Sequence, residues 1–388
     1  MRRNALTPTN NAPACDERGV PLIIGGGPAG TAAAITLARA GHRPILLERK
    51  SRPTDKVCGD FLGTDAIQLV LSLGVDPAAL GAMPIHRVRL VHNDRTAEAT
   101  LPFPALGLSR RTLDAALLCQ AEHVGAEIHT GHTVRRLIHT SGQWSAQTGD
   151  NNPFRSDTVF LATGKHDLRD LPRPGASSGA IGIKMYFTLR SEAARTLERT
   201  IELTLFPGGY AGMQPVEHGQ AVLCIAIQRR VFQACGGNWP GLIAAIGQRS
   251  PRFATMLAGA TASLPRPLAV AGIPYGYQAA VAPTPTLFRL GDQAAVIPSL
   301  TGDGMAIALH SGKSAAEAWL AGSDAAAYHQ SLTRMLAPQM RLAGLLHHAC
   351  MNGLVQAAVV QAVAMFPALL RRSAIHTRLS SNARPAHG

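Results

Sequence analysis

The sequence predicts an α/β fold, in which a parallel sheet with flanking helices is interrupted by an inserted β-sheet and followed by helices. Three observations predict it. Near the N-terminus a short apolar run turns into a glycine-rich loop and then into a helix-like stretch. The segment from about residue 178 to 281 is rich in strand-like runs that alternate apolar and polar residues. The residues from 326 onward have the pattern of helices. We therefore expect the parallel sheet to be built from separated parts of the chain.

The glycine-rich loop has the spacing Gly25-x-Gly27-x-x-Gly30 and directly follows the apolar run PLII. Gly25 permits a tight turn from strand to helix, Gly27 lets the backbone approach a pyrophosphate, and Gly30 lets helix and strand pack closely. Pro28 and Ala29 open the helix, whose N-terminal amides face an anion. An ordinary glycine-rich turn is the alternative, and the position of this spacing between a strand and a helix argues against it.

A second apolar run, PILLERK, predicts the next strand, which ends in an acid. Glu48 lies near the offset of about twenty residues at which a carboxylate binds the hydroxyl groups of a ribose. Arg49 follows it and belongs to the same predicted site. Strand, glycines, helix, strand and acid in this order predict that this region binds a dinucleotide.

Two later segments point to the kind of dinucleotide. RSDTVFLATG, residues 155–164, predicts a strand that ends in Thr163 and Gly164, and LFRLGDQ, residues 287–293, predicts one that ends in Asp292. A turn and a helix of small residues follow, with Pro298, Gly302, Asp303, Gly304 and Met305. With these segments the sequence resembles the FAD-dependent oxidoreductases of the glutathione-reductase type. The resemblance is to the branch that holds geranylgeranyl reductases and aromatic hydroxylases, which are FAD-dependent monooxygenases.

This resemblance implies a Rossmann-like FAD-binding domain and roles for particular residues. In the branch, the acid at the position of Asp292 contacts the ribityl chain, and the glycine turn after it meets the flavin and the pyrophosphate. The segment from Ser109 to Asp114 resembles the family's Arg-x-x-(Leu/Phe)-Asp helix start, which implies that Arg110 lies near the diphosphate or the ribityl chain. A guanidinium suits phosphate oxygens, but a solvated arginine at a helix N-terminus is the alternative.

The segment Lys56-Val57-Cys58-Gly59 resembles the Lys-x-Cys-Gly segment of geranylgeranyl-reductase-like proteins, in which the cysteine lies by the isoalloxazine ring. The resemblance thus implies that Lys56, Cys58 and Gly59 belong to the cofactor site, with Cys58 also a candidate catalytic residue. The alternative is a small buried cysteine without a chemical role. The neighbouring charges suit a partly activated thiol.

Two segments depart from the family pattern. Tyr210, a candidate catalytic residue, stands in a glycine-rich loop that resembles the loop facing the flavin across the substrate pocket, but the family's tryptophan and phenylalanine are absent there. Tyr210 either orients a substrate or packs at a hairpin end with a solvated hydroxyl. At Thr163 and Gly164 the hydroxylases carry Asp-Gly, which assists flavin and nicotinamide binding. NAD(P)H is therefore a candidate electron donor rather than an implied one.

We expect four parts along the chain. They are a disordered leader at 1–18, a discontinuous FAD-binding domain at 19–84, 105–175 and 283–325, a mainly antiparallel substrate domain at 85–104 and 176–282, and a C-terminal helical region at 326–388. The leader lacks the apolar core of a secretory signal.

Composition excludes several classes of protein. The net charge is +13, but aromatic residues make up only 5% and the basic residues are dispersed, so we expect no nucleic-acid partner. The six cysteines, at positions 15, 58, 119, 224, 235 and 350, show no CxxC spacing. We therefore expect a reduced, cytoplasmic chain without a metal site.

The C-terminal region has an unusual charge pattern. No Asp or Glu follows Asp324, and no charged residue lies between Arg341 and Arg371. One interpretation is a helix packed on the enzyme. The other is an interfacial helix anchored by Arg371 and Arg372, which would give the chain a peripheral membrane contact.

The expected function follows mainly from the resemblance. We expect an FAD-dependent oxidoreductase that acts on a small lipophilic unsaturated compound, an isoprenoid or a polyketide-like lipid, with C=C reduction by flavin hydride favoured over the alternatives. The first alternative is hydroxylation of an aromatic or polyketide-like substrate by an FAD-dependent monooxygenase. The second is a flavin electron carrier at the membrane surface, for which the cysteine spacings supply no iron–sulfur ligands. The sequence leaves the oligomeric state open.

Overall fold

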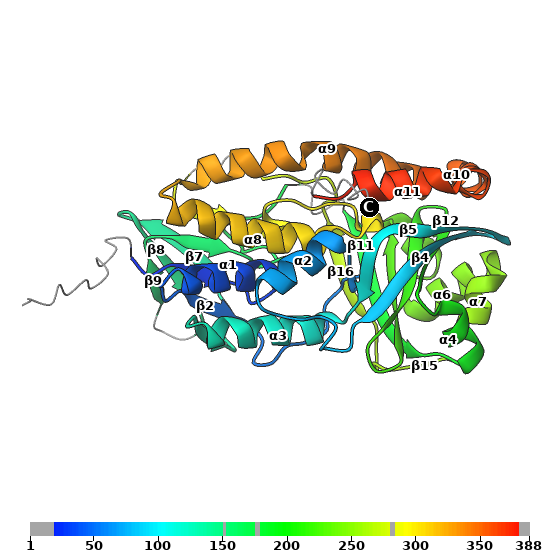
Figure 1. Cartoon of the computed structure of the whole chain (residues 1–388), viewed down its shortest axis with the longest axis horizontal. Coiled ribbons are helices and arrows are strands. Elements are labelled where there is room, and N and C mark those ends of the chain that lie inside the picture. Colours follow the sequence, from blue (N-terminus) through cyan, green and yellow to red (C-terminus); the bar gives the residue numbers. More distant parts are fainter. Residues whose placement is uncertain (1–18, 150–152, 175–178, 280–283, 380–388) are drawn as a thin grey trace, which may run out of the picture.

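The structure is a computed structural model that describes residues 19–149, 153–174, 179–279 and 284–379. The predicted leader at 1–18 lies outside the described residues. The fold is α/β as the sequence predicts, with a parallel sheet and a large, mostly antiparallel sheet lying end to end (Figure 1). A long C-terminal helix runs along both.

The parallel sheet has five strands in the order β17-β10-β1-β2-β6, and every neighbouring pair is parallel. Its strands are β1 (Leu22–Ile24), β2 (Ile45–Glu48), β6 (Glu127–Thr130), β10 (Val159–Leu161) and β17 (Leu287–Arg289). One face packs on α1 (Pro28–Arg39), α2 (Thr64–Ser72), α3 (Arg110–His123) and α8 (Gly304–Leu320) through one apolar core. The central strands β1 and β10 are buried along their whole length, which explains why they read as unbroken apolar runs.

A small sheet covers the other face of the parallel sheet. It consists of β7 (Arg136–Thr140), β8 (Gln143–Gln147) and β9 (Phe154–Ser156), and Trp144 and Leu137 pack from it against the parallel strands. The sequence pattern predicts one strand through residues 126–140. The structure divides it because Gly131 adopts φ +82, a left-handed conformation that ends β6 and lets β7 join the small sheet.

The large sheet has nine strands, which come from three separate regions of the chain. They are β3 (Phe61–Leu62), β4 (Met83–His92), β5 (Arg95–Gly107), β11 (Ala180–Thr188), β12 (Thr200–Phe206), β13 (Gly209–Val216), β14 (Gln220–Ile227), β15 (Thr261–Ala262) and β16 (Leu268–Ile273). The pair β12 and β4 is parallel and the other pairs are antiparallel. The hairpin β4–β5 thus joins the later strands in one sheet.

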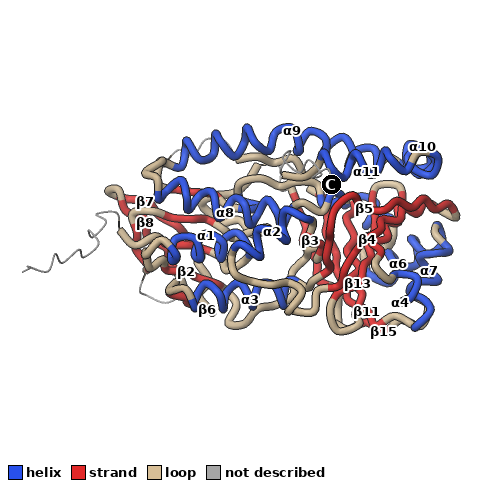
Figure 2. The backbone as a smooth tube through the Cα atoms, viewed as in Figure 1, coloured by secondary structure: helices blue, strands red, loops and turns tan. Residues whose placement is uncertain are grey.

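Short helices cover the outer face of the large sheet (Figure 2). They are α4 (Ser191–Leu197), α5 (Arg229–Ala234), α6 (Trp239–Arg249) and α7 (Pro251–Leu257), and Leu223, Ile225 and Phe253 belong to the core between them and the sheet. Since side chains alternate along a strand, the residues between these core positions face the parallel-sheet domain.

The C-terminal region consists of three helices. They are α9 (Ala325–Met351), α10 (Gly353–Met365) and α11 (Pro367–His376). Asn352 ends α9 and caps α10 through a hydrogen bond from the backbone amide of Leu354 (3.0 Å), and Pro367 at the first position of α11 produces the second break. Val360 and Val363 of α10 are buried against β4, β5 and β12.

Candidate active site

The glycine-rich loop between β1 and α1 has a geometry that only glycine permits at two positions. Gly25 adopts φ +113, and a Cβ there would lie 2.3 Å from the carbonyl oxygen of Ala162. A Cβ on Gly30 would lie 1.9 Å from the carbonyl oxygen of Gly25. At Gly27, in contrast, a Cβ would meet only the guanidinium of Arg110, at 3.4 Å, so this backbone faces open space. The loop therefore has room for a phosphate group at the N-terminus of α1.

Glu48 ends β2 beside this loop and is 7% exposed. Its carboxylate accepts hydrogen bonds from the backbone amides of Gly26 (2.8 Å) and Lys50 (3.1 Å). These bonds hold the carboxylate at the carboxyl edge of the parallel sheet, where the sequence predicts a ribose contact. Arg49 is exposed at the same edge. Burial and then the charge of Arg49 lower the pKa of His166.

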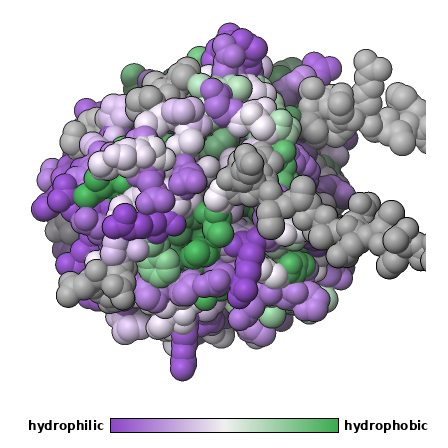
Figure 3. Space-filling view, turned by 90° about the vertical axis from the view of Figure 1, so that its left-hand side faces the viewer, coloured by the Kyte–Doolittle hydropathy of each residue, from purple (hydrophilic) through white to green (hydrophobic). Residues whose placement is uncertain are grey.

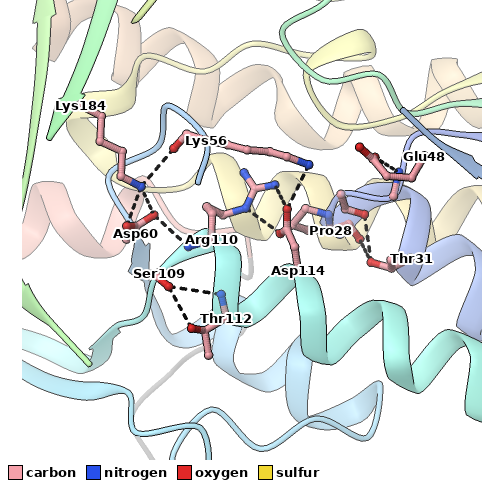
Figure 4. A network of polar contacts seen from close by, with 12 residues as sticks. Pro28, Thr31, Glu48, Lys56, Asp60, Ser109, Arg110, Thr112, Asp114 and Lys184 are labelled. Carbon is pink, nitrogen blue, oxygen red and sulfur yellow. Dashed lines mark hydrogen bonds and ion pairs between the residues drawn. The ribbon is translucent and has the colours of Figure 1, made fainter. Parts of the chain in front are cut away.

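Two cations and one carboxylate lie between the loop and the large sheet (Figure 4). Arg110, the first residue of α3, donates two hydrogen bonds to Asp114, at 2.8 and 3.0 Å, and the amine of Lys56 lies 3.3 Å from the same carboxylate. Burial disfavours the charge of Arg110, but Asp114, Cys58 and Asp60 together outweigh burial and raise the pKa of the guanidinium. The set of Arg110, Lys56 and Asp114 carries a net charge of about +1, which suits a diphosphate.

Asp292 stands after β17 in a short 3-10 turn, Gly291–Gln293. The amine of Lys165 lies 3.1 Å from its carboxylate, and the guanidinium of Arg173 donates a hydrogen bond to its backbone carbonyl (2.8 Å). Burial lowers the pKa of Lys165, but Asp292, Cys58 and Tyr275 together raise it above its usual value. Lys165 is a site residue that the sequence interpretation missed, although it directly follows Thr163 and Gly164.

The turn after Pro298 precedes α8. Gly302 adopts φ +74, and a Cβ on Gly304 would have nothing within 4 Å, so the backbone at Gly304 borders open space. The side chains of Asp303 and Met305 are buried within the protein, at 0% and 5% exposed. These two predicted site residues can therefore offer a cofactor only their backbone groups.

Cys58 lies in a loop that packs against the large sheet. A Cβ on Gly182 of β11 would lie 2.9 Å from the side chain of Val57, and the amine of Lys184 donates to the backbone carbonyl of Lys56 (3.1 Å). Cys58 is partly buried, and a Cβ on Gly59 would meet nothing within 4 Å. The thiol contributes to the electrostatic surroundings of both Arg110 and Lys165, so it lies near both cationic groups.

A buried polar network under this loop was not predicted from the sequence. Asp60 is fully buried in a left-handed conformation (φ 56), and its carboxylate accepts hydrogen bonds from Lys184 (2.6 and 2.7 Å) and Tyr186 (2.6 Å). Burial raises the pKa of Asp60, and Lys184 offsets part of that rise. The amide of Gln214 also donates to the backbone carbonyl of Asp60 (2.9 Å). One feature of the sequence could have indicated this network: Lys184 is a lysine inside an otherwise apolar strand.

Tyr210 connects the large sheet to the turn that precedes α8. It is 4% exposed, and its hydroxyl lies 2.6 Å from the hydroxyl of Ser299. Tyr275 bonds to the same serine at 2.7 Å. The hydroxyl of Tyr210 is thus engaged inside the protein rather than solvated. Leu300 of the same turn packs against this face of the sheet, so the face borders the turn that precedes α8.

These residues fit a dinucleotide with a diphosphate, a ribose and an extended second half. The glycine backbone borders open space, Arg110 and Lys56 supply positive charge, and Glu48 and Asp292 are placed for hydroxyl groups. The hydroxyl of Thr163 is buried without a hydrogen-bond partner, which is an expected property of a group that contacts a ligand. Within the described ranges, no group of three or more His, Cys, Asp or Glu is arranged to hold a metal ion.

Residues 20–159 match the family model of an FAD-binding domain. The chain is an FAD-dependent oxidoreductase. It is 28% identical over 326 residues to the menaquinone reductase of Mycolicibacterium smegmatis, a match that covers 78% of this chain and 76% of that protein. The matched region contains Gly25, Glu48 and Arg110, the residues that the geometry above makes available to a dinucleotide.

Two solved structures share the fold of this flavoprotein. The geranylgeranyl bacteriochlorophyll reductase-like protein of Thermoplasma acidophilum has a TM-score of 0.68 and 17% identity, with 89% of this chain and 91% of that chain covered. The halogenase PltM has a TM-score of 0.72 and 13% identity, with 93% of this chain and 86% of that chain covered. The fold is therefore common to flavoproteins of different chemistry and does not by itself select the reaction.

Proposed function

We propose that the enzyme reduces a C=C bond in a lipophilic unsaturated substrate, an isoprenoid or a polyketide-like lipid, by hydride transfer from reduced FAD. The observation that carries the proposal is the sheet face next to the cofactor region. Gly212 and Cys224 are cross-strand neighbours at its centre, and both remain partly exposed although their strands are central in the sheet. Leu203 and Ala226 adjoin them. This face offers a small, mainly apolar surface for a hydrocarbon chain.

The name of one relative supports this class of substrate. The Mycolicibacterium protein is named a menaquinone reductase. A menaquinone carries an unsaturated isoprenoid chain and has no charged group, which agrees with an apolar binding surface.

The residues around the cofactor region suit the proton step of such a reduction. Bound FAD supplies the hydride, and the second alkene carbon then needs a proton. Cys58 is a thiol near this region and can donate that proton. Reduced FAD is regenerated by an external donor, for which NAD(P)H is the candidate.

Product analysis with chemically reduced holoenzyme tests the reaction. Under argon, a menaquinone should yield a product with one saturated C=C bond, formed in proportion to the flavin oxidised. Under air the same product should form in lower yield, because oxygen competes for the reduced flavin. A product that contains an added oxygen atom and forms only in air would reject the reductase proposal in favour of the monooxygenase.

The substrate class also implies where the enzyme works, and the C-terminal helices supply a surface for it. Their exposed large apolar side chains include Leu345 (72% exposed), Leu354 (92%), Met365 (61%), Phe366 (58%), Leu369 and Ile375. Arg371 and Arg372 are exposed on α11, and α10 carries no charged residue. An apolar area with arginines and without acids is complementary to a membrane with anionic lipids. The enzyme therefore takes up its substrate at such a surface.

The surface of the rest of the molecule differs from that of the C-terminal helices, which supports a local contact with the membrane rather than a helix that spans it. Figure 3 shows the end of the molecule remote from α10, where hydrophilic side chains predominate and hydrophobic ones form smaller groups. Among the described helices, none is by itself long and apolar enough to cross a membrane. Only α9 and α10 taken together meet those criteria, and they are bent by 109°.

Vesicle binding of point variants tests the membrane proposal. Leu354→Glu with Phe366→Glu should abolish cosedimentation with vesicles of phosphatidylglycerol, whereas Leu71→Glu should not, since Leu71 is an exposed leucine on α2. Arg371→Glu with Arg372→Glu should reduce binding to anionic vesicles at low salt. Equal binding of wild-type and Leu354/Phe366 variants would reject this surface. A truncation that removes every residue from Leu342 onward tests this surface less well, because it also removes the buried residues of α10.

A further inference from the structure

A cleft opens between the large sheet and the end of α9. Its volume is about 410 Å³, and its lining includes Ala180, Ile273, Pro274, Tyr275, His347 and Met351. These residues come from β11, β16, the loop after β16 and α9. Part of the lining is apolar, and polar groups come from Gln228, Arg229, Tyr275, Tyr277, His347 and His348.

The inner end of the cleft joins the cofactor region through a cluster of polar aromatic groups. The hydroxyls of Tyr275 and Tyr210 both bond to Ser299, in the turn that precedes α8. The ring of His347 packs edge-on against both tyrosines, with centroid distances of 5.1 Å to Tyr275 and 6.2 Å to Tyr210. The Nδ1 atom of His347 is buried and has no hydrogen-bond partner. A buried polar atom at the end of a cleft is a position at which a ligand can supply the missing bond.

The groups in this cluster are uncharged. Burial raises the pKa of Tyr210 and of Tyr275, so both hydroxyls keep their protons, and it lowers the pKa of His347 to about 4, so the ring is neutral near neutral pH. Arg229 lines the cleft as well, but it is exposed at the rim. Uncharged donors in a partly apolar cleft suit a neutral carbonyl oxygen better than a carboxylate or an ammonium group.

We propose that this cleft binds a planar, carbonyl-bearing ring of the substrate, with His347 and Tyr275 as hydrogen-bonding partners of a carbonyl oxygen. The inference rests on the proposed function and extends it, because it names the oxygenated part of the lipophilic substrate and the residues that recognise it. Ser299 belongs to the turn whose following residues border the cofactor region, so a ring held here lies next to the cofactor. The chain attached to the ring is then left to the apolar sheet face around Gly212 and Cys224.

Binding to the oxidised holoenzyme tests this inference without turnover. Menadione, a naphthoquinone, and methylnaphthalene, which has the same rings without the carbonyl groups, are titrated while the flavin absorbance and fluorescence are followed. Wild-type protein should bind menadione more tightly. His347→Ala should weaken menadione binding by about tenfold, the size of one lost hydrogen bond in a buried site, and leave methylnaphthalene binding nearly unchanged. His347→Gln should restore part of the affinity, because the amide keeps a donor.

His348→Ala is the matched control. His348 is the next residue on α9 and also lines the cleft, but its Nδ1 atom is already paired, since it lies 2.7 Å from the carbonyl oxygen of Gly344 on its own helix. This variant should bind menadione as the wild type does, with equal FAD content and thermal stability showing that each variant is folded. Equal effects of His347→Ala and His348→Ala, or no preference of the wild type for the quinone, would overturn the inference. Selective quinone binding without alkene reduction would keep the inference and reject the proposed reaction.

Discussion

Arg378, two residues beyond the end of α11, forms an ion pair with the fully buried Asp303 in the turn that precedes α8. Its guanidinium also donates a hydrogen bond to the carbonyl oxygen of Thr301 (2.8 Å) and lies 4.4 Å from the ring centroid of Phe103. The sequence pattern groups Arg378 with the basic residues of the C-terminus, but its side chain is only 6% exposed. The end of the chain is therefore tied to the turn that borders the cofactor region, and this arginine is not available to lipid.

Replacing Arg378 should destabilise the protein and loosen its cofactor. In Arg378→Met the carboxylate of Asp303 loses its charge partner while it remains buried, which costs about 3 to 5 kcal/mol in the free energy of unfolding. Thermal unfolding and FAD retention during gel filtration measure the two effects. Arg372→Met is the control, since Arg372 is exposed and its loss should leave both unchanged. If Arg378→Met retains the stability of the wild type, the ion pair does not hold the turn.

The titration of Asp303 should make stability depend on pH. Burial raises the pKa of Asp303 to about 7, although Arg378 opposes the rise. Because the folded pKa is above the unfolded value of 3.8, the folded state binds more protons between these two pH values. The contribution of Asp303 to stability therefore falls as pH rises from about 4 to about 7 and is constant above that range. Asp303→Asn should remove this part of the pH dependence of the melting temperature. Parallel curves for the two proteins would contradict the assignment.

Glu48 should contribute directly to FAD affinity. Glu48→Ala removes a charge-assisted hydrogen bond to the ribose, for which we expect a loss of about 1.5 to 3 kcal/mol in binding free energy. Reconstitution of apoprotein, followed by flavin fluorescence, measures it. Glu127→Ala provides a control on the neighbouring strand β6, where the acid pairs with Arg43 and His129 at the surface. A Glu48→Ala protein with wild-type FAD affinity would show that this carboxylate only supports the loop through Gly26.

The sequence predicts those parts of the site that are formed by contiguous segments of the chain. The loop at Gly25–Gly30, the acid Glu48 and the turn at Asp292 each combine a local backbone geometry with the residue types that the geometry needs, so their pattern is visible in a single chain. Asp60 meets Lys184 and Tyr186 across 124 and 126 residues, and Arg378 meets Asp303 across 75. Such pairs depend on how the inserted sheet and the C-terminal helices dock, which no local pattern records.

Dependence on tertiary packing also explains which features of the fold the sequence does not predict. The order of strands in the large sheet brings β4 beside β12, and only the tertiary structure determines that pairing. The two breaks between the C-terminal helices are not predicted, because apolar residues continue around Asn352 and Phe366, where the chain turns. For His347 the sequence favours core or interface packing, since two adjacent histidines on a helix have no spacing typical of a site. Its contact with Tyr210 and Tyr275 depends on the position of α9 over the sheet.

Breaking the buried pair of Lys184 and Asp60 should cost more than removing both charges. Lys184→Met leaves Asp60 fully buried with only Tyr186 and the backbone amide of Arg110 as donors, and the expected loss is about 3 to 5 kcal/mol in the free energy of unfolding. The double variant Lys184→Met with Asp60→Asn should recover much of this loss, because no buried charge remains. Denaturant unfolding of the single and double variants measures the coupling. Additive losses would show that the two side chains act independently.

The last prediction concerns Cys58, which belongs to the loop that Lys184 contacts and lies near the cationic groups of Arg110 and Lys165. If its thiol supplies the proton to the second alkene carbon, Cys58→Ser should retain FAD but lose turnover, since a positioned acid contributes about 10² to 10⁴ in rate and a hydroxyl is a much weaker acid than a thiol. Single-turnover oxidation of the reduced flavin by a menaquinone under argon measures the step, and KM should change little because the side chain keeps its size. Cys119→Ser is the control, because Cys119 is an exposed thiol on α3. Should Cys58→Ser turn over at the wild-type rate, Cys58 is a packing residue. The monooxygenase alternative, which needs no thiol acid, would then be favoured over the reductase.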